Sequence, residues 1–184
     1  MTKLKIAVYA DGASIEDMLR QYKEGNVKGF TTNPTLMAKA GIKDYKAFAH
    51  SLLAVVKDLP ISFEVFADDF ENMERQAKMI GSWGKNVYIK IPITNTKRES
   101  SLPLIRRLLD HDLKLNVTAI LTDGQIDGLR EIMKPQDDVI VSIFAGRIAD
   151  TGVDPVPMMA RACKLYRDLP KAQILWASPR EVLN

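Results

Sequence analysis

Short apolar runs alternate with longer amphipathic segments along the whole chain. Short runs rich in Val, Ile and Phe are typical of buried strands, and segments with apolar residues every three or four positions are typical of helices. The pattern predicts strands at residues 6–10, 27–32, 61–66, 87–91, 113–118, 139–144 and 174–177. It predicts helices at residues 14–22, from Pro34, at 44–57, 69–80, 100–109, 123–133 and 154–166, and from Arg180 onward.

Repetition of a strand followed by a helix predicts a parallel sheet with helices outside it. The sheet is either open and doubly wound or closed into an eight-stranded barrel. Open sheets that bind nucleotides usually have a glycine-rich turn after the first strand. Here that turn, residues 10–14, contains a single glycine, and neither common nucleotide-binding glycine motif occurs in the chain. We therefore expect an α/β fold of the (β/α)8 TIM-barrel class, forming one domain over residues 1–184.

The predicted barrel holds only seven strand–helix units in this sequence. Typical barrels have about 250 residues and eight strands. We therefore expect the first and seventh strands to flank a gap and to present unpaired edges. Either a neighbouring chain covers this gap, or the sequence is shortened relative to its gene.

Composition and charge exclude several classes of function. The net charge is +3, but Lys and Arg are interleaved with Asp and Glu, whereas nucleic-acid binders usually concentrate their basic residues. A mild positive balance suits substrates that carry phosphate. The longest apolar stretches are far shorter than the roughly 20 residues that cross a bilayer, and residues 1–5 lack the long apolar run of a secretory signal. With Cys163 as the only cysteine, we expect a cytoplasmic protein with no disulfide and no cysteine-rich metal site.

Polar residues recur at the carboxyl ends of the predicted strands. Active-site residues of barrels project from these strand ends and from the loops after them. Any single one of these residues can be explained as a cap or a solvated side chain, but every predicted unit contributes at least one. The residues are Asp11, Thr31, Thr32, Asn33, Glu64, Lys90, Asn116, Thr118, Ser142, Arg147, Ser178 and Arg180.

Lys90 is the residue with the most unusual surroundings, because it lies between Ile89 and Ile91 in a predicted strand. A lysine is almost never fully buried without a partner, and desolvation favours the neutral amine, which attacks carbonyl groups. The alternative is an edge-strand lysine that reaches out to water. A lysine that forms an imine with a ketose needs groups that move protons. Glu64, on the neighbouring strand, suits that task through a water held by Thr118, and Asp11 suits the substrate hydroxyl.

A ketose phosphate also needs groups that hold its hydroxyls and its phosphate. Arg147 follows the sixth predicted strand, and Ser178 and Arg180 follow the seventh, which is where barrels commonly bind phosphate. Guanidinium groups match phosphate oxygens well, although each arginine alone is equally consistent with a surface charge. The side chains suited to sugar hydroxyls are Asn33, Asn116 and Ser142.

Five sequence motifs together resemble one enzyme family. They are FTTNPT at residues 30–35, YIKIPIT at 88–94, NVTA at 116–119, SIFAGRI at 142–148 and WASPR at 176–180. They extend over most of the chain and occur in the order found in the transaldolase family, in its small single-domain form, which is close to fructose-6-phosphate aldolase.

The resemblance implies a TIM barrel that uses no metal and no organic cofactor. It implies transfer of a dihydroxyacetone unit from fructose 6-phosphate or sedoheptulose 7-phosphate to an aldose phosphate, in the pentose phosphate pathway. It assigns the Schiff base to Lys90, proton transfer to Asp11 and Glu64, and water placement to Thr118. Small family members also form pentamers or decamers, so we expect a homo-oligomer. The implied substrate-binding residues are Thr32, Asn33, Asn116, Ser142, Phe144, Arg147, Ser178 and Arg180.

Two positions separate the transaldolases from the aldolases that they resemble. The fructose-6-phosphate aldolases tend to have Gln where this chain has Glu64, and Tyr where it has Phe144. Phe144 has no hydroxyl to assist a free donor, and Glu64 is ionisable, so both residues favour transfer. The alternatives are a fructose-6-phosphate aldolase or, given the missing eighth strand, a catalytically impaired barrel that binds sugar phosphates.

Overall fold

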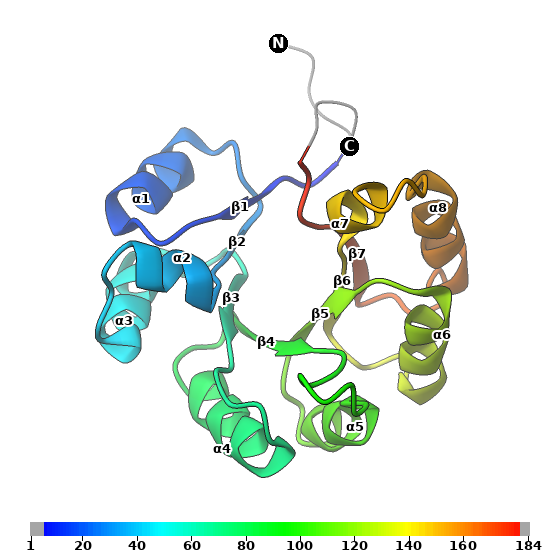
Figure 1. Ribbon diagram of the computed structural model, residues 1–184. Helices are drawn as coiled ribbons and strands as arrows, with labels where there is room; N and C mark the ends of the chain where they lie inside the picture. The colour runs from blue at the N-terminus through cyan, green and yellow to red at the C-terminus, as the bar shows by residue number, and fades with distance from the viewer. Residues whose placement is uncertain (1–5, 181–184) are drawn as a thin grey trace.

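The computed structural model describes residues 6–180, which form alternating strands and helices (Figure 1). The strands are β1 (Tyr9–Asp11), β2 (Gly29–Thr31), β3 (Ile61–Glu64), β4 (Val87–Pro92), β5 (Leu115–Ile120), β6 (Val139–Ile143) and β7 (Ala172–Trp176). The helices are α1 (Ile15–Glu24), α2 (Pro34–Lys39), α3 (Tyr45–Val55), α4 (Phe70–Gly81), α5 (Leu102–Asp110), α6 (Asp123–Ile132), α7 (Ala145–Ala149) and α8 (Val156–Leu165). None of these helices is long and apolar enough to span a membrane.

The seven strands of the described chain form one parallel sheet in the order β1-β2-β3-β4-β5-β6-β7. Each strand pairs with its sequence neighbours, and Figure 1 shows the strands curling around a centre with the helices outside them. This is the architecture of an incomplete TIM barrel, so the predicted fold class is confirmed. Because all strands run in one direction, their carboxyl ends meet at the same end of the barrel.

Most predicted elements are present with shifted ends. The first strand begins at Tyr9 rather than at residue 6, so Asp11 is its last residue and not part of the following loop. Ser14 caps α1 by accepting a hydrogen bond from the Asp17 amide at 3.2 Å. Helix α7 was not predicted, because its five residues are too few to show an apolar periodicity. The helix predicted from Arg180 onward falls on residues 181–184, outside the described residues.

Side chains of the central strands alternate between the barrel interior and the helices. In β4, Ile89 packs against Gly81 at the end of α4, and Lys90 points the other way. All residues of β6, and all but one in each of β4 and β5, are buried. This is expected when helices cover the outside of a parallel sheet and side chains fill its centre. Lys90 therefore faces the interior of the barrel.

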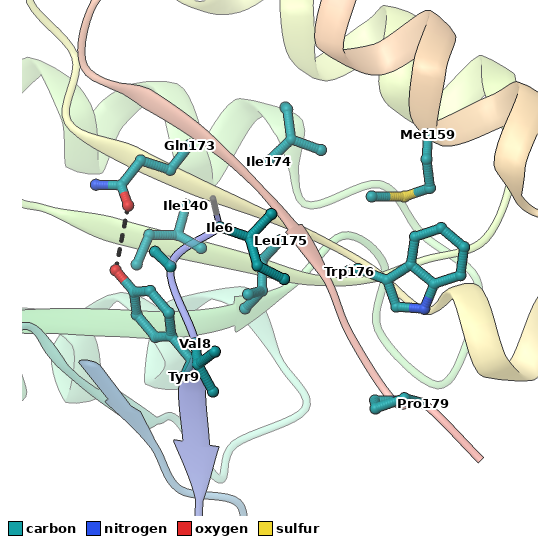
Figure 2. A pocket seen from close by; sticks show the side chains of 11 residues that line it. Ile6, Val8, Tyr9, Ile140, Met159, Gln173, Ile174, Leu175, Trp176 and Pro179 are labelled. Carbon is teal, nitrogen blue, oxygen red and sulfur yellow. Dashed lines mark hydrogen bonds between the residues drawn. The ribbon is translucent and has the colours of Figure 1, made fainter. Parts of the chain in front are cut away.

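Within residues 6–180, β1 and β7 are the two edges of the sheet, as predicted. Tyr9 on β1 reaches across to β7, where its hydroxyl donates to the Gln173 side-chain oxygen at 3.1 Å (Figure 2). A groove beside these strands is lined mainly by apolar side chains, among them Val8, Ile174 and Trp176. None of the predicted site residues lines this groove, so the groove and the candidate site are separate features.

Candidate active site

The Lys90 side chain lies in the barrel interior between two oxygen atoms. Its Nζ is 3.1 Å from Glu64 Oε2 and donates to the Thr32 backbone carbonyl at 3.2 Å. Only 9% of the residue is exposed. Since β4 is hydrogen-bonded to β3 on one side and β5 on the other, Lys90 is not on an edge strand. This excludes the alternative of a lysine that reaches out to water from a sheet edge.

The Glu64 carboxyl group is subject to opposing influences. Burial raises the pKa of Glu64 most strongly, the positive charge of Lys90 lowers it, and the negative charge of Asp11 raises it slightly. The net result is a pKa above that of an ordinary glutamate. A carboxyl group with a raised pKa, in contact with an amine, is suited to exchange protons during carbonyl addition. The register of the sheet places Glu64 directly beside Lys90.

Asp11 lies at the end of β1 and accepts hydrogen bonds from two neighbours. Thr31 Oγ1 donates to one carboxylate oxygen at 2.9 Å, and Asn33 Nδ2 donates to the other at 3.0 Å. Asn33 also caps α2 by accepting from the Leu36 amide at 2.9 Å. The helix cap therefore fixes the amide that holds Asp11. The Asp11 side chain is exposed, which leaves its carboxylate accessible to a bound molecule.

A buried polar chain crosses the interior beside Lys90. Ser142 on β6 donates to Asn116 Oδ1 at 2.6 Å, and Asn116 Nδ2 donates to Ser62 Oγ on β3 at 2.9 Å. All three residues are almost completely buried. Asn116 is the register partner of Lys90 on β5, so this chain of hydrogen bonds runs past the amine. Fully satisfied buried networks of this kind hold side chains in fixed positions.

Thr118 lies two residues after Asn116 on the same strand and is 2% exposed. Its Oγ1 is buried and has no hydrogen-bond partner among the described residues. Ala119, the next residue, has a positive φ of 60°, where the β5–β6 register shifts. The strand is thus distorted at the point where Thr118 presents an unpaired hydroxyl. A buried hydroxyl without a protein partner is suited to bind a water or a substrate group.

The predicted phosphate-binding residues lie where α7 meets the segment after β7. A Cβ atom on Gly146 would lie 1.8 Å from the Ser178 carbonyl oxygen, so only glycine permits this contact. Ser178 has a positive φ of 57°, which turns the chain after the strand. The Arg147 guanidinium lies 4.9 Å from the centre of the Phe144 ring, and Arg180 pairs with Asp150 at 2.7 Å. Arg147 and Arg180 are both exposed.

The sequence matches one family over nearly its whole length. The sequence model of the transaldolase/fructose-6-phosphate aldolase family matches residues 8–184. The chain belongs to this family. Its relatives include a probable transaldolase of Dehalococcoides mccartyi, 32% identical over 178 residues that make up 96% of this chain and 79% of that protein. A probable transaldolase of Roseiflexus sp. is 32% identical over 87% of this chain and 70% of its own length.

The fold also resembles that of a solved enzyme structure. A crystal structure of dihydrodipicolinate synthase from Rhodopseudomonas palustris superposes with a TM-score of 0.58 at 15% identity. The match covers 95% of this chain and 65% of that one, so this chain spans about two thirds of the length of its structural neighbour. At this level of identity the likeness shows the fold alone. It agrees with the TIM-barrel architecture of the transaldolase family.

Three further residues contact the candidate site, and the sequence pattern did not assign them to it. Thr31 was noted only as a strand-end residue, but it holds Asp11. Ser62 lies two positions before Glu64, so the period of the strand places it on the same face, and this signal was available. Tyr45 contacts both Thr32 and Glu64 from the first turn of α3, and no sequence pattern indicated it.

The described residues contain no group of three His, Cys, Asp or Glu side chains that could hold a metal ion. The site instead combines an amine, two carboxylates, amides and hydroxyls at one end of the barrel. The polar partners of Lys90 are Glu64 and Thr32. A set of this kind can add to a carbonyl group, move protons and hold a polyhydroxylated substrate.

Proposed function

We propose that this protein is a transaldolase that transfers a dihydroxyacetone unit between sugar phosphates through a Schiff base at Lys90. The observation that carries the proposal is the buried Lys90 amine, held between Glu64 Oε2 and the Thr32 carbonyl in a member of the transaldolase family. The donor is fructose 6-phosphate or sedoheptulose 7-phosphate, and the acceptor is an aldose phosphate.

The first stage forms an imine. The neutral Lys90 amine attacks C2 of the ketose, and the carbonyl oxygen becomes the hydroxyl of a carbinolamine. Loss of that hydroxyl as water gives the iminium ion, and Glu64 carries the protons that these steps require. The raised pKa of Glu64 supports this role, because a carboxyl group with a raised pKa takes up a proton more readily than an ordinary glutamate. Thr118 holds the water with its otherwise unpaired hydroxyl.

The second stage breaks and remakes a carbon–carbon bond. The C3–C4 bond breaks as Asp11 takes the proton of the C4 hydroxyl. The electron pair of that bond moves toward the iminium nitrogen to give an enamine, and the part of the donor from C4 onward leaves as an aldose phosphate. The enamine carbon then attacks the aldehyde of the acceptor, and Asp11 returns the proton to the new hydroxyl. The hydrogen bonds from Thr31 and Asn33 support this role, because they fix the Asp11 carboxylate. Water finally hydrolyses the imine and frees Lys90.

The remaining predicted residues bind the substrate in this proposal. Asn116 and Ser142 orient the donor hydroxyls, supported by their fixed positions beside Lys90. Exposed guanidinium groups at the end of the barrel meet the phosphate, supported by the contact between Gly146 and Ser178 that brings their segments together. The full set is Thr32, Asn33, Asn116, Ser142, Phe144, Arg147, Ser178 and Arg180.

Transfer is favoured over simple cleavage by two side chains. Phe144 offers no hydroxyl near α7, and Glu64 is an ionisable group in contact with Lys90. The family description covers both activities, so aldolase activity is the alternative. An enzyme that protects its enamine from water needs an acceptor to complete each cycle.

Acceptor dependence tests this proposal. Fructose 6-phosphate is supplied with and without erythrose 4-phosphate, and sugar phosphates are separated by chromatography. We expect sedoheptulose 7-phosphate and glyceraldehyde 3-phosphate only when the acceptor is present, and no product with Lys90→Met. Release of glyceraldehyde 3-phosphate at the same rate without the acceptor would assign the aldolase activity instead. Binding without any turnover would assign a catalytically impaired barrel.

The cellular setting is part of the same proposal. We expect a cytoplasmic homo-oligomer, a pentamer or decamer, acting in the pentose phosphate pathway, with no nucleic-acid or membrane partner. Sugar-phosphate substrates agree with the membership of the family. Analytical ultracentrifugation checks the oligomer, and a monomer at micromolar concentration would contradict it.

A further inference from the structure

Tyr45 contacts both residues that hold the Lys90 amine. It is the first residue of α3, outside the sheet, and its hydroxyl reaches the ends of β2 and β3. The Tyr45 oxygen lies 2.8 Å from the Glu64 amide nitrogen and 3.2 Å from Thr32 Oγ1. Thr32 and Glu64 are the two residues whose oxygen atoms lie next to Lys90 Nζ. A single hydroxyl therefore links both supports of the amine.

The direction of each hydrogen bond in this group follows from counting protons. The Thr32 hydroxyl donates its one proton to the Ser62 carbonyl at 3.1 Å. The Tyr45 hydroxyl must therefore donate to Thr32, and it accepts from the Glu64 amide. Burial raises the pKa of Tyr45, so its proton stays in place. Each donor in this series of hydrogen bonds, from the Glu64 amide through the Tyr45 and Thr32 hydroxyls, therefore has one acceptor, and the series ends at the Ser62 carbonyl.

Tyr45 also interrupts the regular ladder between β2 and β3. Phe30 and Thr32 donate their amides to the carbonyls of Pro60 and Ser62, at 2.9 and 3.0 Å. The regular parallel pattern would next take the Glu64 amide to the Thr32 carbonyl. Instead, the Glu64 amide donates to Tyr45, and the Thr32 carbonyl accepts from Lys90. The tyrosine oxygen thus replaces a backbone acceptor and leaves that acceptor to the lysine.

The ring of Tyr45 is held independently of its hydroxyl. It packs edge-on against Phe63, Phe66 and Trp83, with ring centres 5.9, 4.8 and 5.7 Å away. Edge-to-face contacts of this kind stabilise aromatic clusters beyond the area they bury. A phenylalanine at position 45 would keep these three contacts. The substitution therefore removes the hydroxyl with little change in packing.

We propose that Tyr45 is a positioning residue for the Schiff-base lysine. Its hydroxyl keeps the Glu64 amide away from the Thr32 carbonyl, so that this carbonyl and the Glu64 carboxylate together aim the Lys90 amine. Tyr45 itself touches no reacting atom, and its role rests on the function proposed above. Displacements of about 1 Å at such a site can slow a reaction about 10²-fold.

The test compares Tyr45→Phe with Tyr166→Phe. Tyr166 is a matched control, because it is buried and its hydroxyl donates to the Ile126 carbonyl at 2.8 Å, away from Lys90. Borohydride reduction in the presence of fructose 6-phosphate, followed by mass spectrometry, gives the rate of adduct formation on Lys90. We expect Tyr45→Phe to slow this rate about 10- to 100-fold with an unchanged KM for the donor. Tyr166→Phe should lower the melting temperature and leave the rate of adduct formation on Lys90 unchanged. Equal rates in wild type and Tyr45→Phe, or equal slowing in both variants, would overturn the proposal.

A crystal structure of Tyr45→Phe separates this proposal from the proposed function. We expect the Glu64 amide to bond the Thr32 carbonyl, and Lys90 Nζ to leave it. An unmoved Lys90 would overturn the positioning role, whether or not wild type forms an adduct, whereas the lack of a wild-type adduct would overturn the function alone. If Tyr45→Phe does not fold, a variant with 3-fluorotyrosine at position 45 takes its place. Its ring is kept, and its hydroxyl oxygen is a weaker acceptor for the Glu64 amide. A wild-type rate with that residue would likewise overturn the role.

Discussion

The Lys90 amine lies 3.1 Å from a carboxylate oxygen of Glu64, and the two side chains are only 11% and 18% exposed. Transfer of one proton from Lys90 to Glu64 converts this ion pair into a neutral amine and a carboxylic acid. Both neutral forms are the ones that carbinolamine chemistry uses. Burial, which raises the pKa of Glu64, makes its carboxyl group a better proton acceptor in this transfer. The proposed mechanism begins from this contact.

Replacement of Glu64 by glutamine tests its proton-carrying role. Glutamine keeps the size and a hydrogen-bond acceptor but cannot exchange protons. We expect Glu64→Gln to slow imine formation about 10²-fold, the lower end of general acid–base effects. The control is Glu74→Gln, which removes a surface carboxylate paired with Lys78 and Arg107. That variant should retain the wild-type rate, and a wild-type rate in Glu64→Gln would contradict the role.

The pH dependence of imine formation reports on the same pair. The rate should fall on acidification through the raised pKa of Glu64, above the value of about 4.3 for an ordinary glutamate. The negative charge of Asp11 contributes to that rise, so Asp11→Asn should move the acidic limb to lower pH. Borohydride trapping measures this step without requiring carbon–carbon cleavage. Asp17→Asn, which removes an exposed carboxylate paired with Arg20, should leave the limb in place. An acidic limb of the pH–rate profile that moves equally in both variants would refute the assignment of this limb to Glu64.

The Thr118 hydroxyl is expected to lower the stability of the protein and to speed imine formation. Its buried Oγ1 has no partner among residues 6–180, and such groups typically cost about 1–3 kcal/mol. Thr118→Val should therefore raise the free energy of unfolding by about 1 kcal/mol in urea, and slow imine formation about 10-fold. Thr122→Val is the contrasting variant, because Thr122 caps α6. Thr122→Val should lower the free energy of unfolding by about 1 kcal/mol and leave the rate of imine formation unchanged. Loss of stability in Thr118→Val would argue against the unpaired hydroxyl.

Gly146 is expected to control the phosphate-binding segment. An alanine there would force Ser178 away, since its Cβ would lie 1.8 Å from the Ser178 oxygen. We expect Gly146→Ala to lower the free energy of unfolding by about 1–3 kcal/mol and to raise the KM for fructose 6-phosphate. Gly124 is also helical, and a Cβ there meets no atom within 4 Å. Gly124→Ala should be neutral or stabilising by up to about 1 kcal/mol. An unchanged KM in Gly146→Ala would separate this contact from phosphate binding.

Much of the fold was predictable, because apolar periodicity reports directly on which side chains are buried. The alternation of strands and helices implied a parallel sheet, and parallel strands bring their carboxyl ends together. The strand pattern therefore predicts that Asp11, Glu64, Lys90 and Asn116 lie at one end of the barrel. Their catalytic roles stay predictions until the variants are measured.

The contacts that orient the site were not predictable from the chain. Tyr45 acts through the docking of α3 against the ends of β2 and β3, which joins residues 13 and 19 positions apart. Strand and helix periods describe which face of an element is buried, but not which hydroxyl replaces a backbone acceptor. The close approach of Gly146 to Ser178 likewise depends on how α7 packs, and five residues show no period.

Borohydride trapping on the wild-type protein tests the central claim most directly. The protein is reduced in the presence of fructose 6-phosphate and digested, and the peptide that contains Lys90 is analysed by mass spectrometry, with Lys90→Met as the control. The account predicts a stable sugar adduct on Lys90 that forms only with the ketose and is absent from Lys90→Met. An unmodified Lys90 peptide, or an adduct confined to other lysines, would contradict it.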